Sequence, residues 1–393
     1  MTTQLTASIT DHDAAVAAVT ALAPAVAAGA SVRDLARDLP FDEVTALSAS
    51  GLLGITVPRE YGGAGLGAVS LAVVTATLAA ADASLAQIPQ SHFVFVDAAR
   101  RVGTDMLKRR LFGRVLAGAR IANAQTERGG RTVLDDATAL RRTARGLRLT
   151  GTKYYCTGAA FADLLAVRAV GPDGGSVVAY VPADAEGVTI ADDWDGVGQR
   201  TTSSGTVAFD DVVVDDDLVL DFALLRSTPG TYGTTAQLLH AAVDVGIARG
   251  ALDALPDLVG RARPWFEADV ERAADDPLLI AQAGELEIDV RAAEALLEHA
   301  ARTVDAADDS RRSIADAALA TAAAKVAAGR AARRVGSELF DIGGTRAASS
   351  AANLSRHWRD ARTHTLHDPE RWKVQHLGRW ALDRRTPPSH GTL

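Results

Sequence analysis

The order in which hydrophobic patterns follow one another along the chain constrains the fold most strongly. From Asp11 to about Gly118, apolar residues recur at three- and four-residue spacing, which is typical of amphipathic helices. Residues 120–220 change to short β-branched and aromatic runs separated by turn signals, and long helical segments rich in Ala and Leu return after Gly230. Because a central β unit must bury its apolar face against neighbouring helices, this order indicates an α+β protein.

The chain is also too long for a single core. It has 393 residues, whereas one hydrophobic core stops growing at about 250–300 residues. We therefore predict an N-terminal all-α domain over residues 1–119, a central antiparallel β domain over 120–225 and a C-terminal helical bundle over 226–393. Within the bundle, the pattern predicts helices at about 234–263, 277–307, 313–340 and 353–367.

Composition excludes several classes of protein. The formal net charge is −8 and no stretch is dominated by Lys and Arg, so the chain lacks the positive charge that nucleic-acid phosphates require. Its one cysteine, Cys156, excludes an internal disulfide and fits a reducing compartment. The polar N-terminal residues lack the apolar core of a secretory signal, and the apolar window 14–30 is Ala-rich and contains Pro24. We expect a soluble, cytoplasmic protein that does not span a membrane.

Common phosphate and metal motifs do not account for the sequence. Gly146–Lys153 has glycines at Walker A spacing, but its Lys stands in the wrong order, and residues 61–67 lack the dinucleotide-binding spacing. His364 and His367 lie at i, i+3 on one helical face, with Asp368 beside the second. These residues could ligate a metal, cap or stabilise a helix end, or face a substrate. We expect no metal, because no further ligand is spaced to complete a site.

Segments throughout the chain together resemble the acyl-CoA dehydrogenase superfamily. They are GLLGITVPREYGG (51–63), NAQTERGG (123–130), GTKYYCTGA (151–159), GQRTTSSGTVAFDDVVV (198–214) and WRDARTHTLHD (358–368). The similarity is closer to the flavin-dependent monooxygenase branch, which includes sulfur-acquisition oxidoreductases and dibenzothiophene monooxygenases. That likeness is carried by IPQSHFVF (88–95), FADLL (161–165), DDWDGVGQRTT (192–202), RARPWFEADVERAADDP (261–277) and RTHTLHDPERWK (362–373).

Two departures from the dehydrogenase pattern decide the expected chemistry. The resemblance assigns the dehydrogenase base to a Glu followed by Gly, where this chain has Asp368 followed by Pro369. The other usual location of the base, residues 231–246, contains no Glu. The resemblance therefore implies a monooxygenase that uses reduced FMN and O2, through a flavin peroxide, to oxygenate a small organosulfur compound. A partner flavin reductase is expected, since no NAD(P)H site is visible. The alternatives are an acyl-CoA dehydrogenase with FAD and Asp368 as a weak base, and a flavin-binding scaffold without catalysis.

The resemblance also implies site residues. The expected catalytic set is His92, Cys156, His364 and His367. The expected cofactor contacts are Asn123, Thr126, Cys156, Thr157, Trp194, Arg263, Gly343 and Gly344. Cys156 and His92 could instead be buried core residues, and the other positions could serve as turns, caps or packing. Relatives supply the phosphate-binding Arg, here Arg263 or Arg261, from a neighbouring subunit, so a homo-oligomer, a dimer or tetramer, is expected.

Overall fold

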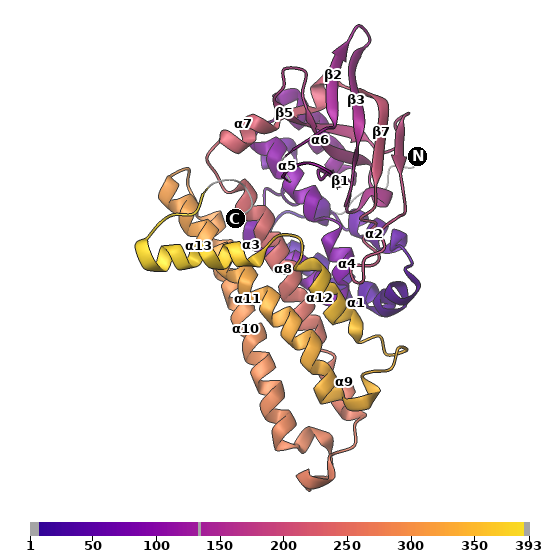
Figure 1. Cartoon of the computed structure of the whole chain (residues 1–393), viewed down its shortest axis with the longest axis vertical. Coiled ribbons are helices and arrows are strands. Elements are labelled where there is room, and N and C mark those ends of the chain that lie inside the picture. The colour runs from indigo at the N-terminus through magenta and orange to yellow at the C-terminus, as the bar shows by residue number, and fades with distance from the viewer. Residues whose placement is uncertain (1–7, 133–134, 389–393) are drawn as a thin grey trace.

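The computed structural model describes residues 8–132 and 135–388. Residues 1–7, on which the prediction of no secretory signal partly depends, lie outside this range. Within it, N-terminal helices, a β-sheet and a long C-terminal bundle follow one another in the predicted order (Figure 1). The domain limits at residues 119 and 225 stay predictions, although the last N-terminal helix ends at Leu116 and the first strand begins at Ile121.

The N-terminal part consists of helices that pack on one another and on the bundle. They are α1 (His12–Ala36), α2 (Phe41–Ala49), α3 (Ala68–Ala81), α4 (Ala83–Gln87), α5 (Gln90–Val102) and α6 (Asp105–Leu116). Asp11 caps α1 by accepting a hydrogen bond from the Ala14 amide. By length and composition alone, α1 could cross a membrane, and within the described residues it is the one helix of this kind. Val19 and Val26 of α1 are nevertheless fully buried in the protein core.

The central part is an eight-stranded sheet in the order β6-β7-β3-β2-β4-β5-β8, with β1 also paired to β4. The strands are β1 (Ile121–Ala124), β2 (Ala139–Thr143), β3 (Gly146–Lys153), β4 (Leu164–Val170), β5 (Ser176–Pro182), β6 (Val188–Ile190), β7 (Val207–Val214) and β8 (Val219–Asp221). Most neighbours are antiparallel, as predicted, but β4 pairs in parallel with β1 and with β2. The sheet is therefore mixed, because a long crossover joins β1 to β4 and short-range turn signals do not reveal such a connection.

Both faces of the central strand β4 are buried. Leu164 and Ala166 face a core shared with α5 and α6, whereas Leu165 and Val167 belong to a second core on the other face of the sheet. The hydroxyl of Tyr180 on β5 donates a hydrogen bond to the carbonyl of Phe95 on α5 at 2.8 Å. These contacts fix the sheet against the N-terminal helices.

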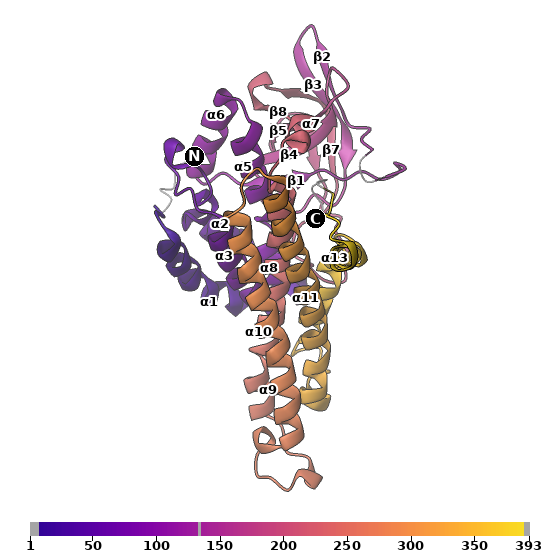
Figure 2. The ribbon, with the colours of Figure 1, turned by 90° about the vertical axis from the view of Figure 1, so that its left-hand side faces the viewer.

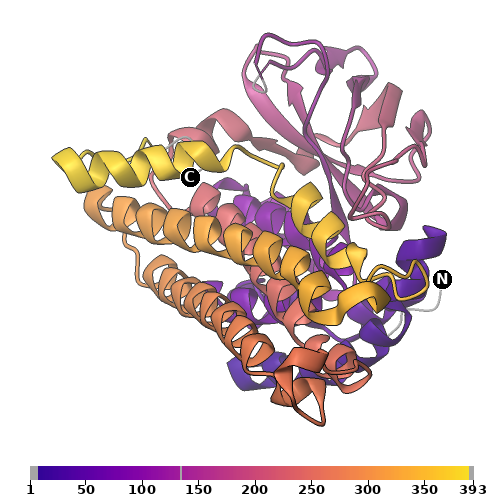
Figure 3. The ribbon, with the colours of Figure 1, turned by 60° about the horizontal axis from the view of Figure 1, so that its bottom comes forward.

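The C-terminal part is a bundle whose long helices run away from the sheet (Figures 1 and 2). It follows the short α7 (Phe222–Ser227) and contains α8 (Tyr232–Leu252), α9 (Leu255–Gly260), α10 (Pro277–Asp305), α11 (Arg311–Gly343), α12 (Ser355–His364) and α13 (Glu370–Asp383). The helix predicted at 234–263 is divided into α8 and α9, with Pro256 in the first turn of α9. The last helix, α13, lies across α11 (Figure 3).

Close packing between α3 and α8 depends on Gly246. A Cβ atom at this position would lie 2.4 Å from the carbonyl oxygen of Ala76 and 2.4 Å from the Cβ of Ala79. We expect Gly246→Ala to lower the free energy of unfolding by about 1–3 kcal/mol, because α3 must move to admit the methyl group. Urea unfolding measures this change.

A matched control for this substitution is available on α10. Gly284 is exposed, and a Cβ atom there would meet nothing within 4 Å. Gly284→Ala should raise stability by up to about 1 kcal/mol, since Ala favours a helix. A Gly246→Ala variant as stable as the Gly284→Ala variant would contradict the close α3–α8 contact.

Candidate active site

Four of the predicted flavin contacts lie together at one end of the sheet. The Asn123 side-chain amide on β1 donates to the carbonyl of Tyr155 at 3.3 Å, and the Asn123 backbone amide donates to the carbonyl of Thr157 at 3.4 Å. The carbonyl of Thr126 accepts from the Tyr154 amide at 2.8 Å. The rings of Trp194 and Tyr155 meet edge to face, with centroids 6.4 Å apart. The structure thus brings Asn123, Thr126, Thr157 and Trp194 to one surface.

Unusual backbone conformations occur in segments next to this surface. Tyr155, Gln199 and Ser203 have positive φ angles of 56°, 53° and 48°. Residues held in this region cost free energy and cluster at functional sites. The Thr157 hydroxyl lies 2.8 Å from that of Ser204, and the ring of Tyr155 is half-exposed. An exposed aromatic ring with adjacent amide and hydroxyl groups fits the planar, hydrogen-bonding ring of a flavin.

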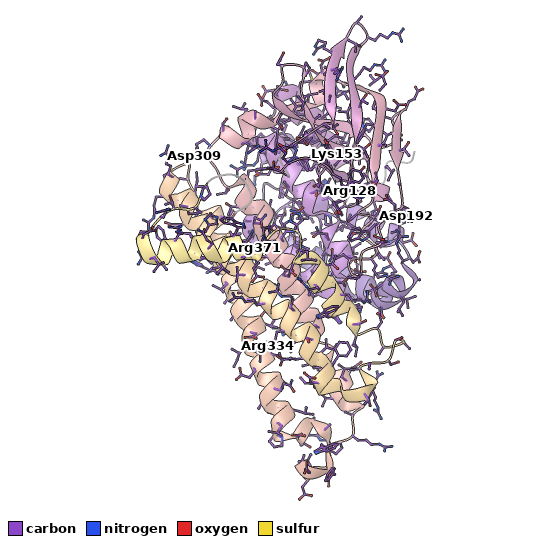
Figure 4. The ribbon with its side chains drawn as sticks, viewed as in Figure 1. Arg128, Lys153, Asp192, Asp309, Arg334 and Arg371 are labelled. Atoms are coloured by element: carbon purple, nitrogen blue, oxygen red, sulfur yellow. The ribbon has the colours of Figure 1, made fainter. Side chains whose placement is uncertain are left out.

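A buried ion cluster supports the segment that follows β1. The ammonium of Lys153 is completely buried and lies 2.6 Å from Glu127 and 3.0 Å from Asp136, and Arg168 pairs with Asp136 at 2.7 Å. Figure 4 shows Lys153 and Arg128 within the β part of the molecule. Burial raises the pKa of Glu127, but hydrogen bonds from Lys153 and from backbone amides outweigh it and lower this pKa to about 2.

Cys156 does not share the open surface of its neighbours. Its side chain has no exposed area in the ligand-free chain and packs in the core on one face of the sheet. A side chain that contacts a bound flavin should be exposed when no flavin is present, so the structure does not support the predicted flavin contact. The physical reason is the backbone after β3, which ends at Lys153: Tyr155 has a φ angle of 56°, and Tyr155 faces outward whereas Cys156 faces inward. Burial also raises the pKa of the thiol to about 12, which keeps it protonated.

His92 is held by the backbone at both ring nitrogens. Its Nε2 lies 2.9 Å from the carbonyl oxygen of Leu53, and its Nδ1 accepts from the Ile121 amide at 3.2 Å. This pattern requires a neutral ring with the proton on Nε2. Burial lowers the pKa of His92 to about 4, consistent with that neutral form. The geometry favours a role for His92 in joining α5 to β1 rather than in catalysis, contrary to the sequence-based assignment.

His364 and His367 belong to a cluster between α8, α12 and α13. Nδ1 of His364 lies 2.6 Å from the carboxylate of Asp244, and Nε2 of His364 lies 3.0 Å from Nδ1 of His240. The ring of His367 stacks on that of His240, with centroids 3.9 Å apart. His364 is buried, whereas the His367 side chain is 49% exposed. The cluster therefore reaches the surface through His367.

Asp368 is held between two lysines. One carboxylate oxygen lies 2.9 Å from the ammonium of Lys325 on α11, and the other is paired with Lys373 on α13. Burial raises the pKa of Asp368, but the adjacent His367 and the two ammonium groups outweigh it and hold this pKa well below its usual range. A carboxylate of this kind is a weak base, so Asp368 is poorly suited to remove a proton from carbon.

The loop that carries Trp194 connects the surface at Asn123 to the histidine cluster. The indole of Trp194 donates to the carbonyl of Gln199 at 2.8 Å, and the Gln199 amide donates to Asp360 on α12 at 2.6 Å. Burial raises the pKa of Asp360 to about 7. His364 follows Asp360 by one helical turn, so the two lie on the same face of α12. The surface at Asn123 and the cluster at His364 are thus joined by one helix and one loop.

The other predicted cofactor contacts lie near the far end of the bundle. Arg263 follows α9 by three residues, and α9 lies toward the end of the bundle that is remote from the strands (Figures 1 and 2). Gly343 is at the same end, because a Cβ atom there would lie 3.5 Å from the side chain of Leu258 on α9. Gly344 follows directly, with a φ angle of 61°. Within one chain, these residues do not meet the surface at Asn123.

Several residues of the cluster were not anticipated from the sequence. They are His240, Asp244, Lys325 and Lys373. The segment LLHAAVDVG was considered only for a missing Glu, yet it carries His240 and Asp244 four residues apart in an otherwise apolar helix. Polar residues at helical spacing within an apolar run were the available signal, because a buried polar group requires a partner.

The chain thus combines N-terminal helices, a central sheet and a C-terminal helical bundle. Residues 10–119, 122–212 and 238–369 match the acyl-CoA dehydrogenase N-terminal, middle and C-terminal domains, and the chain belongs to the acyl-CoA dehydrogenase family. The predicted family and fold are confirmed.

Individual relatives are more specific than the family. The chain is 32% identical to dibenzothiophene monooxygenase of Rhodococcus qingshengii, over 95% of this chain and 94% of the relative. It is 32% identical to the probable FMNH2-dependent monooxygenase SfnC of Pseudomonas putida, over 91% and 92%. The crystal structure of FMN-bound TdsC from Paenibacillus sp. A11-2 superposes with a TM-score of 0.91 at 32% identity, covering 96% of this chain and all of that one. These similarities support FMN as the cofactor.

Proposed function

We propose that the protein is a monooxygenase that uses reduced FMN and O2 to oxygenate a small organosulfur compound. The observation that carries the proposal is a contrast within the histidine cluster. His364 and His367 both lie beside His240, whereas the carboxylate of Asp368 is paired with the ammonium groups of Lys325 and Lys373. The relatives named for dibenzothiophene and for FMNH2 support the substrate class and the cofactor. Bound reduced FMN would supply the electrons that activate O2, one atom entering the substrate and the other leaving as water.

The residues of this chain then have separate tasks. Asn123 and Thr157 would hold the flavin ring by hydrogen bonds, with Tyr155 and Trp194 as aromatic contacts. Their loop and α12 would shield the ring from water. Imidazoles of the cluster would hold or move protons through their ring nitrogens.

Three further features belong to the proposal. A separate flavin reductase would supply reduced FMN, in keeping with the relative named as FMNH2-dependent. A cytoplasmic location fits the single cysteine of the chain. A homo-oligomer, a dimer or tetramer, would let the far end of one bundle complete the flavin site of a neighbouring subunit.

The function is tested by supplying the protein with chemically reduced FMN, ¹⁸O2 and dibenzothiophene or a smaller sulfide. One ¹⁸O atom should appear in the sulfoxide or sulfone product by mass spectrometry. An acyl-CoA that bleaches protein-bound FAD without oxygen would instead support the dehydrogenase alternative. Failure to form oxygenated product from any sulfur substrate tried, with reduced FMN bound, would overturn the proposal.

The predicted phosphate contact gives a mutational test. Arg263 is exposed and forms no ion pair within the described part of the chain, whereas its rival Arg261 pairs with Asp257 at 3.4 Å. We expect Arg263→Ala to weaken FMN binding by about 10- to 100-fold, since a charged hydrogen bond is worth about 1.5–3 kcal/mol. Fluorescence titration with FMN measures this change, and Arg261→Ala is the control. Equal affinities for wild type and Arg263→Ala would remove Arg263 from the site.

A further inference from the structure

Three buried side chains of α8 and α12 form a continuous chain of hydrogen bonds. The Oδ1 atom of Asp244 lies 2.6 Å from Nδ1 of His364, and Nε2 of His364 lies 3.0 Å from Nδ1 of His240. The second oxygen of Asp244 is buried without a hydrogen-bond partner in the described part of the chain. Among the described residues, His364 is therefore the side chain that hydrogen-bonds this carboxylate, through one of its two oxygens.

The side-chain types of Asp244, His364 and His240 determine which atom donates and which accepts in each of these hydrogen bonds. A carboxylate only accepts, so the proton between Asp244 and His364 is on Nδ1 of His364. In a neutral His364, Nε2 then has no proton and accepts from Nδ1 of His240. His240 is left with a proton-free Nε2, which has no hydrogen bond within residues 8–132 and 135–388.

Positive charges lie near the His240 end of these three hydrogen-bonded side chains, and a negative charge lies at the other end. The ring of His367 lies against that of His240. Asp368, next to His367, is paired with Lys325 on α11 and Lys373 on α13. Burial, together with His367 and the two lysines, holds the pKa of His240 well below its ordinary value. The negative charge of Asp244 lies at the opposite end of this hydrogen-bonded series, beside His364. A positive charge added to these three side chains is therefore closest to a negative partner at His364.

We propose that Asp244, His364 and His240 form a proton relay that serves the oxygenation reaction, and this proposal rests on the function proposed above. Reduced FMN would be the source of the proton, and the water formed from O2 would be its destination. When Nε2 of His240 takes up this proton, the Nδ1 proton of His240 passes to Nε2 of His364. The resulting imidazolium is paired with the Asp244 carboxylate. Return of the proton by the same steps restores the starting state, so the relay gains and loses none over one cycle. Asp244 and His364 are positioning residues, because they act through His240.

The relay is tested first without any cofactor. ¹⁵N-histidine NMR of the ligand-free protein should show a low-field Nδ1 proton for His364. In Asp244→Asn, this signal should weaken, because the carboxylate that accepts the Nδ1 proton of His364 is lost. The matched control is Asp253→Asn, since Asp253 is an exposed carboxylate at the end of the same helix. A folded Asp244→Asn protein with wild-type histidine signals would overturn the relay.

The second test uses the reaction. Asp244→Asn should lower formation of oxygenated product by about 100-fold or more and shift its pH profile, with little change in KM. If Asp244→Asn fails to fold, His240→Gln leaves the contact between Asp244 and His364 in place. This second variant should keep the low-field proton and lose product to the same degree, and undiminished product formation would overturn the relay. A wild-type protein that makes no product would overturn the proposed function, while the histidine signals would still decide the relay.

Discussion

Replacing Lys153 by methionine is expected to lower the free energy of unfolding by about 3–5 kcal/mol. The Lys153 ammonium has no exposed area and lies between the carboxylates of Glu127 and Asp136. Methionine fills most of the same space but leaves two buried negative charges, whose remaining partners among the described residues are Arg168 and backbone amides. Removing one partner of a buried ion pair is strongly destabilising for this reason. Urea unfolding followed by tryptophan fluorescence measures the loss.

An exposed ion pair on the same sheet provides the control. Arg142 pairs with Asp216, and both side chains are more than half exposed. Arg142→Met should cost no more than about 1 kcal/mol, because water screens the pair. Equal losses for the two variants would show that burial of Lys153 is not the cause.

The same cluster predicts how stability depends on pH. The pKa of Glu127 lies at about 2 in the folded protein, below its ordinary value of 4.5. A lowered pKa contributes stability that is fully present above the unfolded value and is lost as the pH falls toward the folded value. Wild-type stability should therefore decline between pH 4.5 and about 2, and this part of the decline should shrink in Lys153→Met.

Replacing Asp368 by asparagine is the second change with a large expected effect. Asparagine keeps the shape of the side chain but leaves the ammonium groups of Lys325 and Lys373 without the carboxylate between them. We expect a loss of about 3–5 kcal/mol in the free energy of unfolding. The double variant Asp368→Asn, Lys373→Met should be more stable than Asp368→Asn alone, because it removes the repulsion between the ammonium groups of Lys325 and Lys373.

This double-variant comparison also separates the two enzymatic hypotheses. If Asp368 is a clamped structural ion, the stability changes will be large and strongly non-additive. If it is instead the base of an acyl-CoA dehydrogenase, Asp368→Asn will abolish reduction of bound flavin by an acyl-CoA while stability changes little. The exposed pair Glu298 and Arg302 on α10 offers Glu298→Gln as a neutral control.

The parts of the site that could be predicted from sequence are those encoded in local segments. The segments NAQTERGG and GTKYYCTGA led to Asn123, Thr126 and Thr157, and the structure places these residues together because β1 lies beside the segment that follows β3. Cys156 shows the limit of such reasoning. A motif identifies a segment, but whether Tyr155 or Cys156 faces outward depends on the backbone at Tyr155, whose φ angle is 56°.

Only part of the histidine cluster could be predicted from the sequence. The spacing of His364 and His367 placed both on one helix face, yet their partners come from α8, α11 and α13, more than a hundred residues away in the case of His240. Sequence patterns report periodicity within one helix and carry no information about which helix packs against it. The contacts of His92 could not be predicted for the same reason, since its two backbone partners belong to distant segments.

The sequence by itself determined the order of helical and β parts, the approximate limits of the long helices and the family to which the chain belongs. These properties depend on the spacing of apolar residues and on motifs that are contiguous in the chain. The tertiary structure alone decided that Asp368 pairs with two lysines, that Asp244 lies beside His364, and that α9, the helix before Arg263, lies toward the end of the bundle remote from the strands. The physical reason is that charge, burial and proton position depend on contacts between helices, which form only when the bundle and sheet pack together.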